Sequence, residues 1–303
     1  MALALGVAAG LVAWGLHARA GFWPDSVYPW AAAQMLRGGI DPYRALPGGL
    51  VEPFQAPLLY PLTTVLAMLP LSWLTLAAAG GVLMGCSTAL LAWLLMGEGM
   101  HRLWMLASAP FLMAVNLGQW SPLVTAAALL PAAGWLATLK PNLGLAVFVG
   151  RPSWRFALSM GVAGVISLLV LPRWPLEWLA AVRSLPGHPA PVLSLGGAGL
   201  VLLAALVRWR SADARLLLAM ACVPQLLLFA DQLPLWLIAR DRRETMLLSG
   251  ASLVAFDGWF ALLPPGEPDV LAAQPWVLAG VYLPALFLVL RRRAGRSDPA
   301  EER

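Results

Sequence analysis

Charged residues are scarce in this sequence, and their scarcity limits the class of protein that it can encode. Only 12% of the 303 residues are Asp, Glu, Lys or Arg, whereas 60% are hydrophobic. A soluble domain carries about a quarter charged residues, so this chain has too little polar surface to cover a water-soluble globule. Lipid must therefore solvate much of its exterior. The composition predicts an all-α, polytopic integral membrane protein.

Cysteine is nearly absent, and the common catalytic motifs are missing. Cys86 and Cys222 lie in apolar runs and can build neither a disulfide framework nor a zinc site. The sequence has no P-loop, Rossmann fingerprint, HExxH motif or serine-hydrolase elbow. The three histidines lie far apart along the chain. We expect no cofactor, and the sequence indicates no divalent metal because it shows no clear cluster of ligands, although it leaves metal dependence open. The templates of soluble enzymes do not apply.

Lysine is also rare, and the arginines gather in short clusters between apolar runs. The only lysine is Lys140, and the arginine clusters lie at 151–155, 208–215, 240–243 and 291–296. This distribution is typical of the positive-inside pattern of membrane proteins and not of nucleic-acid binding. It predicts a multi-pass protein of a bacterial inner membrane, with these clusters on the cytoplasmic side.

The same pattern sets the expected domain organisation. We expect one transmembrane domain at 1–290 and a charged cytoplasmic tail at 291–303. The longer polar segments should all lie on the outer face, and they are found near 21–56, 171–191 and 257–275. The sequence does not indicate an oligomeric state.

The apolar runs predict about ten to twelve transmembrane or re-entrant helices. A spanning helix needs about 20 apolar residues, and several of these runs are shorter. Short segments are tolerated where protein or a water-filled cavity covers their backbone. Leu3–Leu16 lacks a basic flank and a cleavage site, which favours a retained helix over a signal peptide. Ser26–Leu36 is typical of a short interfacial helix.

Asp25 is the sharpest candidate for chemistry, because it follows the first apolar run at an expected outer surface. A carboxylate that is partly removed from water can act as a general base with a raised pKa. The competing interpretation is an ordinary helix N-cap, for which Asp is favoured. Asp41, before Pro42 and after two glycines, and Glu52, before Pro53, are typical of turns.

Three further polar residues interrupt apolar runs. Gln119, Lys140 and Asp231 lie at expected membrane depth, where polar side chains are costly and usually face a cavity or a partner helix. Lys140 is a candidate partner for a phosphate. The competing interpretations are a hydrogen bond between helices for Gln119 and a lysine that snorkels to the interface for Lys140.

Read in order, these segments resemble a known family. The string Asp25-Ser-Val-Tyr28-Pro-Trp, continuing to Gly39-Ile-Asp41-Pro-Tyr43, resembles the first outer loop of the polytopic GT-C glycosyltransferases. The most similar group is that of the polyprenol-phosphate-mannose-dependent α-mannosyltransferases of the phosphatidylinositol mannoside type. Shorter segments resemble its later motifs, and these are Tyr60-Pro61, Gly118-Gln119, Lys140-Pro141 and Pro224–Asp231.

The resemblance implies a GT-C-like helical bundle and a reaction. A sugar, by family default mannose, would pass from a polyprenyl-phosphate donor to a glycolipid or glycan acceptor at the outer face. Asp25 takes the position of the catalytic base. The other candidate contacts to substrate are Tyr28, Asp41, Tyr43, Gln119, Lys140, Arg183, His188 and Asp231. Membrane lipids and the lipid-linked sugar are the expected partners, and no nucleic acid is expected.

Two other classes of function remain open from the sequence. Asp231, Lys140 and Gln119 could line the path of a transporter for lipid-linked or small polar substrates. The chain could also be an inactive, GT-C-like accessory protein, since only 20 residues separate Gln119 from Lys140 and Tyr60-Pro61 keeps one proline of a Tyr-Pro-Pro run. The absence of an internal repeat, together with polar residues that gather toward one face, favours the enzyme or its inactive relative over a transporter.

Overall fold

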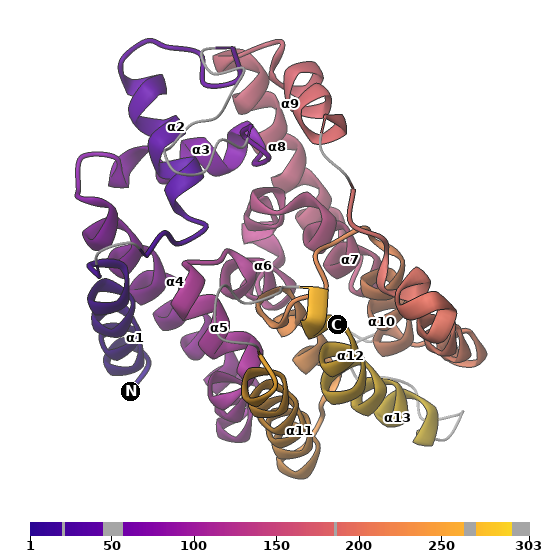
Figure 1. The fold of residues 1–303 in the computed structure, drawn as a ribbon. Helices are drawn as coiled ribbons and strands as arrows, with labels where there is room; N and C mark the ends of the chain where they lie inside the picture. The colour runs from indigo at the N-terminus through magenta and orange to yellow at the C-terminus, as the bar shows by residue number, and fades with distance from the viewer. Residues whose placement is uncertain (20–21, 45–56, 185–186, 264–270, 293–303) are drawn as a thin grey trace.

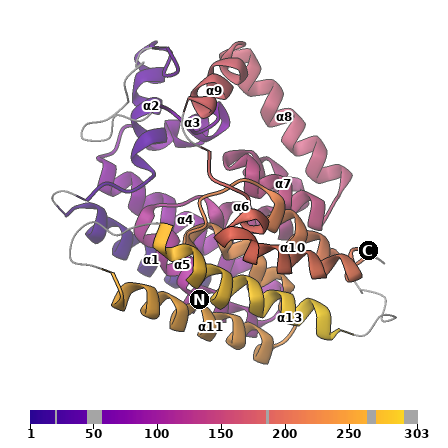
Figure 2. The same cartoon turned by 45° about the vertical axis from the view of Figure 1, so that its right-hand side comes forward.

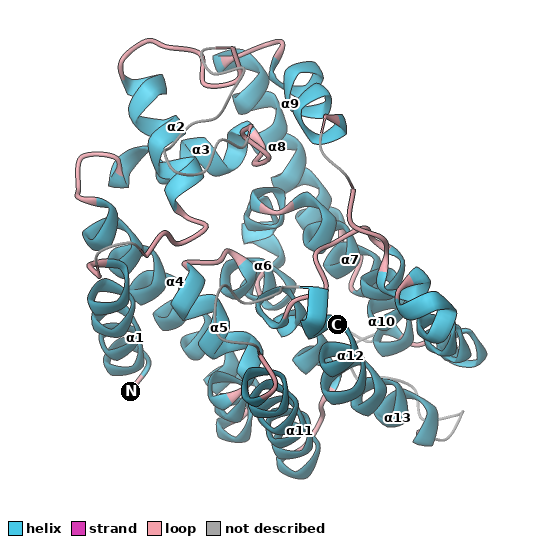
Figure 3. Cartoon of the chain, in the orientation of Figure 1, coloured by secondary structure: helices cyan, strands magenta, loops and turns pink. Residues whose placement is uncertain are grey.

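The computed structural model describes residues 1–19, 22–44, 57–184, 187–263 and 271–292. Throughout these residues the chain forms helices and loops and no strand, which confirms the all-α class (Figure 3). The α-helices are α1 (Ala2–His17), α2 (Val27–Arg37), α3 (Leu62–Met68), α4 (Leu76–Glu98), α5 (Ala109–Leu117), α6 (Ser121–Leu129), α7 (Pro141–Gly150), α8 (Trp154–Val170), α9 (Trp174–Arg183), α10 (Ala212–Cys222), α11 (Arg242–Ala261), α12 (Gln274–Val277) and α13 (Leu283–Arg291). Tighter helical segments lie between them at η1 (Leu69–Leu71), η2 (Met100–Ala107), η3 (Pro131–Leu139), η4 (Pro191–Leu193), η5 (Leu195–Arg208), η6 (Phe229–Ile238) and η7 (Leu271–Ala273), and a π-helical turn lies at η8 (Leu278–Tyr282).

Two of the described helices are long and apolar enough to cross a membrane. They are α4, with 23 residues, and the continuous segment Leu271–Arg291, with 21. A third candidate is α8 together with α9, which meet at a bend of 97°. The structure thus confirms two to three helices that are long and apolar enough to span a membrane, whereas a total of ten to twelve crossing or re-entrant helices stays a prediction.

Glycine allows α1 and α4 to pack with their backbones in close contact. Gly6 and Gly10 on α1 face Gly81 and Gly85 on α4, so the two helices present a four-residue spacing of glycines to each other. A Cβ atom added at Gly10 would lie 2.8 Å from the carbonyl oxygen of Gly81. Small residues at such spacings are common where membrane helices approach closely.

We expect the substitution Gly10→Ala to destabilise the protein. The new methyl group would meet backbone atoms of α4, which cannot rotate away, and overpacking of this kind costs about 1–3 kcal/mol. Gly15→Ala is the matched control, because a Cβ atom there meets nothing within 4 Å. The free energy of unfolding, measured in detergent, should be lower for Gly10→Ala than for Gly15→Ala. Equal values for the two variants would contradict the close packing of α1 and α4.

Prolines and one glycine break the middle of the chain into short helices. Gly118 adopts a left-handed conformation (φ 63°) that ends α5, and Pro122 then opens α6. Pro131 opens η3, which packs back against α6 as a short hairpin, and Pro141 opens α7. Because proline removes a backbone donor and fixes φ, it is well tolerated only at the start of each helix. The breaks therefore leave polar side chains at the points where these helices begin.

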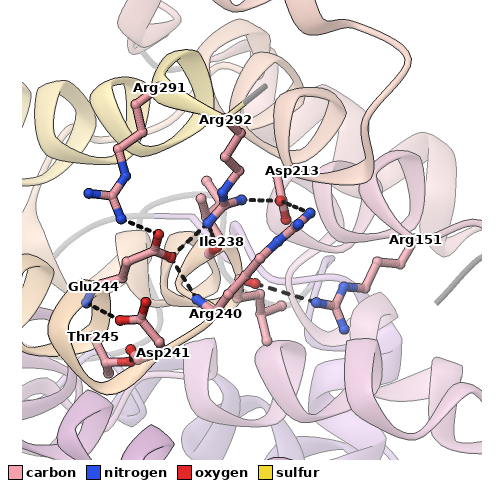
Figure 4. A network of polar contacts seen from close by, with 10 residues as sticks. Arg151, Asp213, Ile238, Arg240, Asp241, Glu244, Thr245, Arg291 and Arg292 are labelled. Carbon is pink, nitrogen blue, oxygen red and sulfur yellow. Dashed lines mark hydrogen bonds and ion pairs between the residues drawn. The ribbon is translucent and has the colours of Figure 1, made fainter. Parts of the chain in front are cut away.

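The arginine clusters meet at one end of the molecule, as the positive-inside pattern predicts. Figure 4 shows Arg292 reaching Asp213 and Glu244, with Arg240 and Arg291 beside it. Arg292 Nη2 lies 2.8 Å from Glu244 Oε2 and Arg240 Nη2 lies 2.9 Å from Asp213 Oδ2. This arginine face ties α10, α11 and α13 together. The tail from residue 293 lies outside the described residues.

The expected outer segments lie mostly at the opposite end. Figures 1 and 2 both place α2, α3 and α9 at the top of the molecule and α11 and α13 below. A helix at the expected position 26–36 is present as α2, and its place at a membrane interface stays a prediction. Residues 45–56, including the turn predicted at Glu52, lie outside the described residues. The segment 257–275 was expected to be a loop, but it begins inside α11, which continues to Ala261 because its apolar and small residues remain helix-compatible.

Two short helices connect the arginine face with the middle of the molecule. α7 lies between Lys140 and Arg151, which flank its two ends, and η6 ends at Ile238, two residues before Arg240. A ten-residue α-helix is about 15 Å long and a ten-residue 3₁₀ helix about 20 Å. Both are shorter than the hydrocarbon core of a bilayer, which is about 30 Å thick. The starts of these helices therefore lie within about 20 Å of the arginine face, a distance shorter than the thickness of that core.

Candidate functional site

Four polar residues from four separate segments meet at the starts of these short helices. The side-chain amide of Gln119 donates to a carboxylate oxygen of Asp25 and accepts from Lys140, whose Nζ lies 2.9 Å from Gln119 Oε1. Lys140 Nζ also lies 2.5 Å from Asp231 Oδ1. The result is a continuous chain of hydrogen bonds from Asp231 through Lys140 and Gln119 to Asp25.

The local sequence explains why these side chains converge. Asp25 follows α1 in a loop whose backbone is fixed by a 2.9 Å bond from its N–H to the carbonyl of Leu117. Gln119 comes directly after the left-handed glycine that ends α5. Lys140 is the residue before α7, and Asp231 lies in the first turn of η6. Each of the four residues therefore lies at or beside a break between helices. At such a break the side chain can point toward the space between the helices.

Asp25 is not the helix cap that its position also allowed. Ser26 is the residue that precedes α2, and its side chain makes no capping hydrogen bond. The Asp25 carboxylate instead bonds to Gln119 and lines a cavity. Burial raises the pKa of Asp25 to about 6, the positive charge of Lys140 opposes this rise, and the negative charge of Asp231 adds to it. The carboxyl group is thus poised to exchange a proton near neutral pH.

The cavity beside these residues has a volume of about 580 Å³ and a mostly apolar wall. It is formed by the first outer segment, the starts of the short helices, the end of α9 and the segment between α10 and η6. The residues that line it are Asp25, Tyr28, Pro57, Leu59, Tyr60, Pro61, Gln119, Leu139, Lys140, Pro141, Asn142, Trp178, Val182, Gly187, His188, Pro224, Gln225, Leu226, Leu228, Ala230 and Asp231. A few polar groups in an apolar hollow of this size are typical of a small-molecule site.

Lys140 is the positive group of the cavity, and its charge is already partly balanced. Its side chain is 17% exposed and that of Asp231 is 9% exposed, so water screens the pair weakly. An ammonium group has three donors, and Asp231 and Gln119 accept two of them. The third remains to interact with a group that enters the cavity.

The structure brings most of the sequence-predicted site residues to this cavity and leaves three outside it. Tyr28 and His188 line the cavity together with the four residues of the hydrogen-bonded chain. Asp41, Tyr43 and Arg183 do not line it. Arg183 is exposed at the end of α9.

Asp41 and Tyr43 instead connect the first outer segment to its surroundings. Asp41 Oδ1 accepts from the backbone N–H of Tyr43 at 3.0 Å, which is the turn that the Asp-Pro sequence predicts. The Tyr43 hydroxyl donates to the carbonyl of Tyr60 at 2.8 Å, and its ring stacks on Trp174 at the start of α9. Both residues therefore support the wall of the cavity and do not face its interior.

Helix α9 covers the cavity on the side away from the arginine face (Figures 1 and 2). Trp178 Nε1 donates to the carbonyl of Leu59 at 2.8 Å, and Arg44 Nε lies 2.6 Å from Glu177 Oε1. Trp178 and Val182 face the cavity. The sharp bend after α8 is what directs α9 across this opening. The first and second outer segments thus meet above the cavity, whereas no described residue of 257–275 lines it.

Two amide side chains of the cavity were missed by the sequence analysis. Asn142 Nδ2 donates to the carbonyl of Pro224 at 3.2 Å, and Gln225 lies buried beside the cavity. Gln225 Oε1 accepts from Gln232 at 3.1 Å, and Gln232 Oε1 lies 2.7 Å from the hydroxyl of Tyr282. The sequence did contain a signal for both residues, because each is an amide side chain beside or within an apolar run. A buried amide needs hydrogen-bond partners, so such a residue indicates a polar contact inside the protein. This network links the cavity wall to the helical segment Leu271–Arg291.

Within the described residues, no three His, Cys, Asp or Glu side chains lie close enough together to hold a metal ion. The expectation of a site without a resident metal stays a prediction.

Comparison with known proteins gives no family, relative or fold to compare: no protein-family model, no curated protein and no solved structure matches the chain.

Proposed function

We propose that this chain is a glycosyltransferase that moves a sugar from a polyprenyl-phosphate donor to a glycolipid or glycan acceptor at the outer face of the membrane. The observation that carries the proposal is the position of the Asp25 carboxylate in a mostly apolar cavity. This carboxylate is hydrogen-bonded to Gln119, which in turn is hydrogen-bonded to Lys140. The order of these residues along the chain is also the order in which the resemblance to GT-C enzymes assigns its motifs. Mannose is the sugar that this resemblance favours.

The proposed reaction needs one base and one stabilised leaving group. The acceptor hydroxyl gives its proton to Asp25, and its oxygen attacks the anomeric carbon of the sugar. The bond between that carbon and the phosphate oxygen breaks, and polyprenyl phosphate leaves with the electron pair. The third N–H of Lys140 supports the negative charge that develops on the phosphate. Gln119 keeps Asp25 oriented, because it is held by Lys140 on its other side.

The apolar wall of the cavity suits a lipid-linked donor. Leu59, Val182 and Leu226 line it beside the polar groups, and Trp178 closes it from above. The first isoprene units can contact these side chains, while the phosphate and sugar lie near Lys140 and Asp25. His188, Tyr28, Asn142 and Gln225 are then the candidates for hydrogen bonds to sugar hydroxyls.

The direct test is a transfer assay with the purified full chain in proteoliposomes. The donors are polyprenyl phosphates that carry a radiolabelled mannose, glucose or arabinofuranose, and the acceptors are membrane glycolipids. We expect labelled product from at least one donor, and release of polyprenyl phosphate in equal amount. If no donor loses its sugar while the protein remains folded, the enzyme proposal fails, and the transporter and the inactive accessory protein remain.

We also expect transfer to increase with pH and to level off above pH 6 to 7. Asp25 accepts a proton only when it is ionised, and its pKa is about 6, so protonation below that value removes the base. Lys140→Met should move the rising limb of kcat/KM to higher pH, because Lys140 lowers the pKa of Asp25. Asp231→Asn should move it to lower pH, because Asp231 raises that pKa. If neither substitution changed the pH at which kcat/KM rises, Asp25 would not be the titrating group.

A transporter is the second candidate, and the Lys140–Asp231 ion pair favours it. Paired charges inside the thickness of a membrane are typical of substrate and proton pathways. A transporter would move the labelled lipid or sugar across a sealed proteoliposome without breaking the bond between sugar and phosphate. The assay above separates the two functions, because only the enzyme releases polyprenyl phosphate.

A further inference from the structure

A second hollow lies on the side of the molecule, and it shares no lining residue with the cavity. It is a groove of about 800 Å³ between α3, η3 and α8. The residues that line it are Thr63, Leu66, Ala67, Pro70, Ala132, Trp135, Trp154, Arg155, Leu158, Ser159, Val162, Ala163 and Ile166. Nearly all of these side chains are apolar, so the groove suits a hydrocarbon chain.

The two hydroxyl groups in the groove are already used inside the protein. Thr63 Oγ1 donates to the carbonyl of Thr138 at 2.8 Å, and Ser159 Oγ accepts from the backbone N–H of Trp135 at 3.0 Å. Neither group therefore demands water in the groove. The side chains of Leu158, Val162 and Ile166 are each more than 50% exposed, so the part of the chain that the structure describes leaves this face of α8 uncovered.

Arg155 gives this groove a charged end. It is the only charged residue among those that line the groove, and it lies over the ring of Trp154 at 5.7 Å. Among the described residues, no carboxylate lies within 4.0 Å of its guanidinium group. The positive charge is thus available to an anion from outside the chain, and a guanidinium group matches the geometry of a phosphate.

The length of the groove matches one leaflet of a bilayer. From Arg155 to Ile166 the wall follows α8 for eleven residue steps, or about 17 Å at 1.5 Å per residue. One leaflet of hydrocarbon is about 15 Å thick, half of the whole core. Arg155 lies in the first turn of α8, four residues after Arg151, which bonds to the carbonyl of Leu237 beside the arginine face. The charged end of the groove therefore lies toward the same membrane surface as that face.

We propose that this groove binds one anionic phospholipid of the leaflet at the arginine face, with an acyl chain along α8 and the phosphate at Arg155. The charge of the groove favours an anionic headgroup over a zwitterionic one, and its length favours an acyl chain over a small ligand. The site is independent of the chemistry proposed for the cavity.

The groove and the cavity share a wall. Thr63 lines the groove and bonds to the carbonyl of Thr138, and Thr64 beside it donates to the carbonyl of Leu139 at 2.6 Å. Leu139 lines the cavity and precedes Lys140. A bound acyl chain would therefore pack against the segment that positions Lys140, and it would support that segment from behind.

The test is native mass spectrometry of the detergent-purified full chain with phosphatidylglycerol or phosphatidylcholine that carry the same acyl chains. We expect one retained phosphatidylglycerol per chain, bound about fivefold more tightly than phosphatidylcholine, which is the preference that one arginine near a membrane surface supplies. Arg155→Gln should remove the preference and leave weak binding of both lipids. Ala163→Trp should fill the groove and reduce the retention of both.

Arg210→Gln is the matched control, because Arg210 also lies over a neighbouring exposed tryptophan, Trp209, but lines no part of the groove. It should bind lipid as the wild type does. Thermal unfolding shows whether each variant is folded. Equal retention of the two lipids by the wild type would overturn the proposal. So would unchanged retention by Ala163→Trp, or a mass of two chains without lipid, which would instead assign the groove to a second copy.

Discussion

The substitution Asp25→Asn is expected to reduce sugar transfer at least a hundredfold while leaving the protein folded. A positioned general base contributes about 10²–10⁴ to the rate, and an amide cannot accept the proton of the acceptor hydroxyl. Asparagine has the size of aspartate, and its oxygen can still accept from Gln119, so the cavity should keep its shape. The measurement is kcat/KM for transfer across pH 5 to 9, with thermal unfolding as the check on folding.

Asp257→Asn provides the control for this experiment. Asp257 is an exposed acid on α11 and lines no part of the cavity, so the same change of charge should leave transfer within about twofold of wild type, as expected for a surface substitution. The residual activity of Asp25→Asn should no longer show the rising limb near pH 6. Full activity in Asp25→Asn would remove this residue as the base, and an equal loss in both variants would show a general effect of charge.

The second large effect is expected on stability. Lys140→Met should cost about 3–5 kcal/mol in free energy of unfolding, because it leaves the Asp231 carboxylate buried without its partner. Asp231→Asn should cost less, since Lys140 keeps Gln119 as an acceptor. The double variant should recover most of the loss, because it buries no charge. Unfolding in mixed micelles measures all three free energies.

The single and double variants of Lys140 and Asp231 form a double-mutant cycle, and the ion pair of Arg44 and Glu177 serves as its comparison. Arg44 is 54% exposed, so water screens this ion pair, and Glu177→Gln should cost less than about 1 kcal/mol. A double variant of Lys140 and Asp231 that loses as much stability as the sum of the single variants would contradict direct coupling between them. The coupling energy is informative even if transfer activity is lost in every variant.

Much of the candidate site could be predicted from single residues. Asp25, Gln119, Lys140 and Asp231 are each a polar interruption between apolar runs, and the cost of such groups in a membrane is what made them visible. The arginine face could be predicted for the same reason, since the charge pattern alone sets which ends of helices lie together. The helical class followed from composition.

Other parts of the site depend on contacts that no local pattern contains. Periodicity did not show that α9 turns across the cavity. The contacts that hold α9 there join Trp178 to Leu59 and Glu177 to Arg44, residues that are far apart in the sequence. Asp41 and Tyr43 lie in a segment that resembles a substrate loop, yet their partners are the backbone and α9. Gln225 was missed because its partners, Gln232 and Tyr282, come from later helices.

The short helices between the cavity and the arginine face have a consequence for the membrane as an insulator. If the cavity admits water, only α7 and η6 separate that water from the solution on the other side of the membrane. The whole membrane voltage then falls across the length of these two helices. All ten residues of η6 are buried, with Phe229 and Trp236 fully enclosed. We therefore expect dense packing at this level to prevent ions and protons from leaking through the protein, with the paired charges of the arginine face at the far end of these helices.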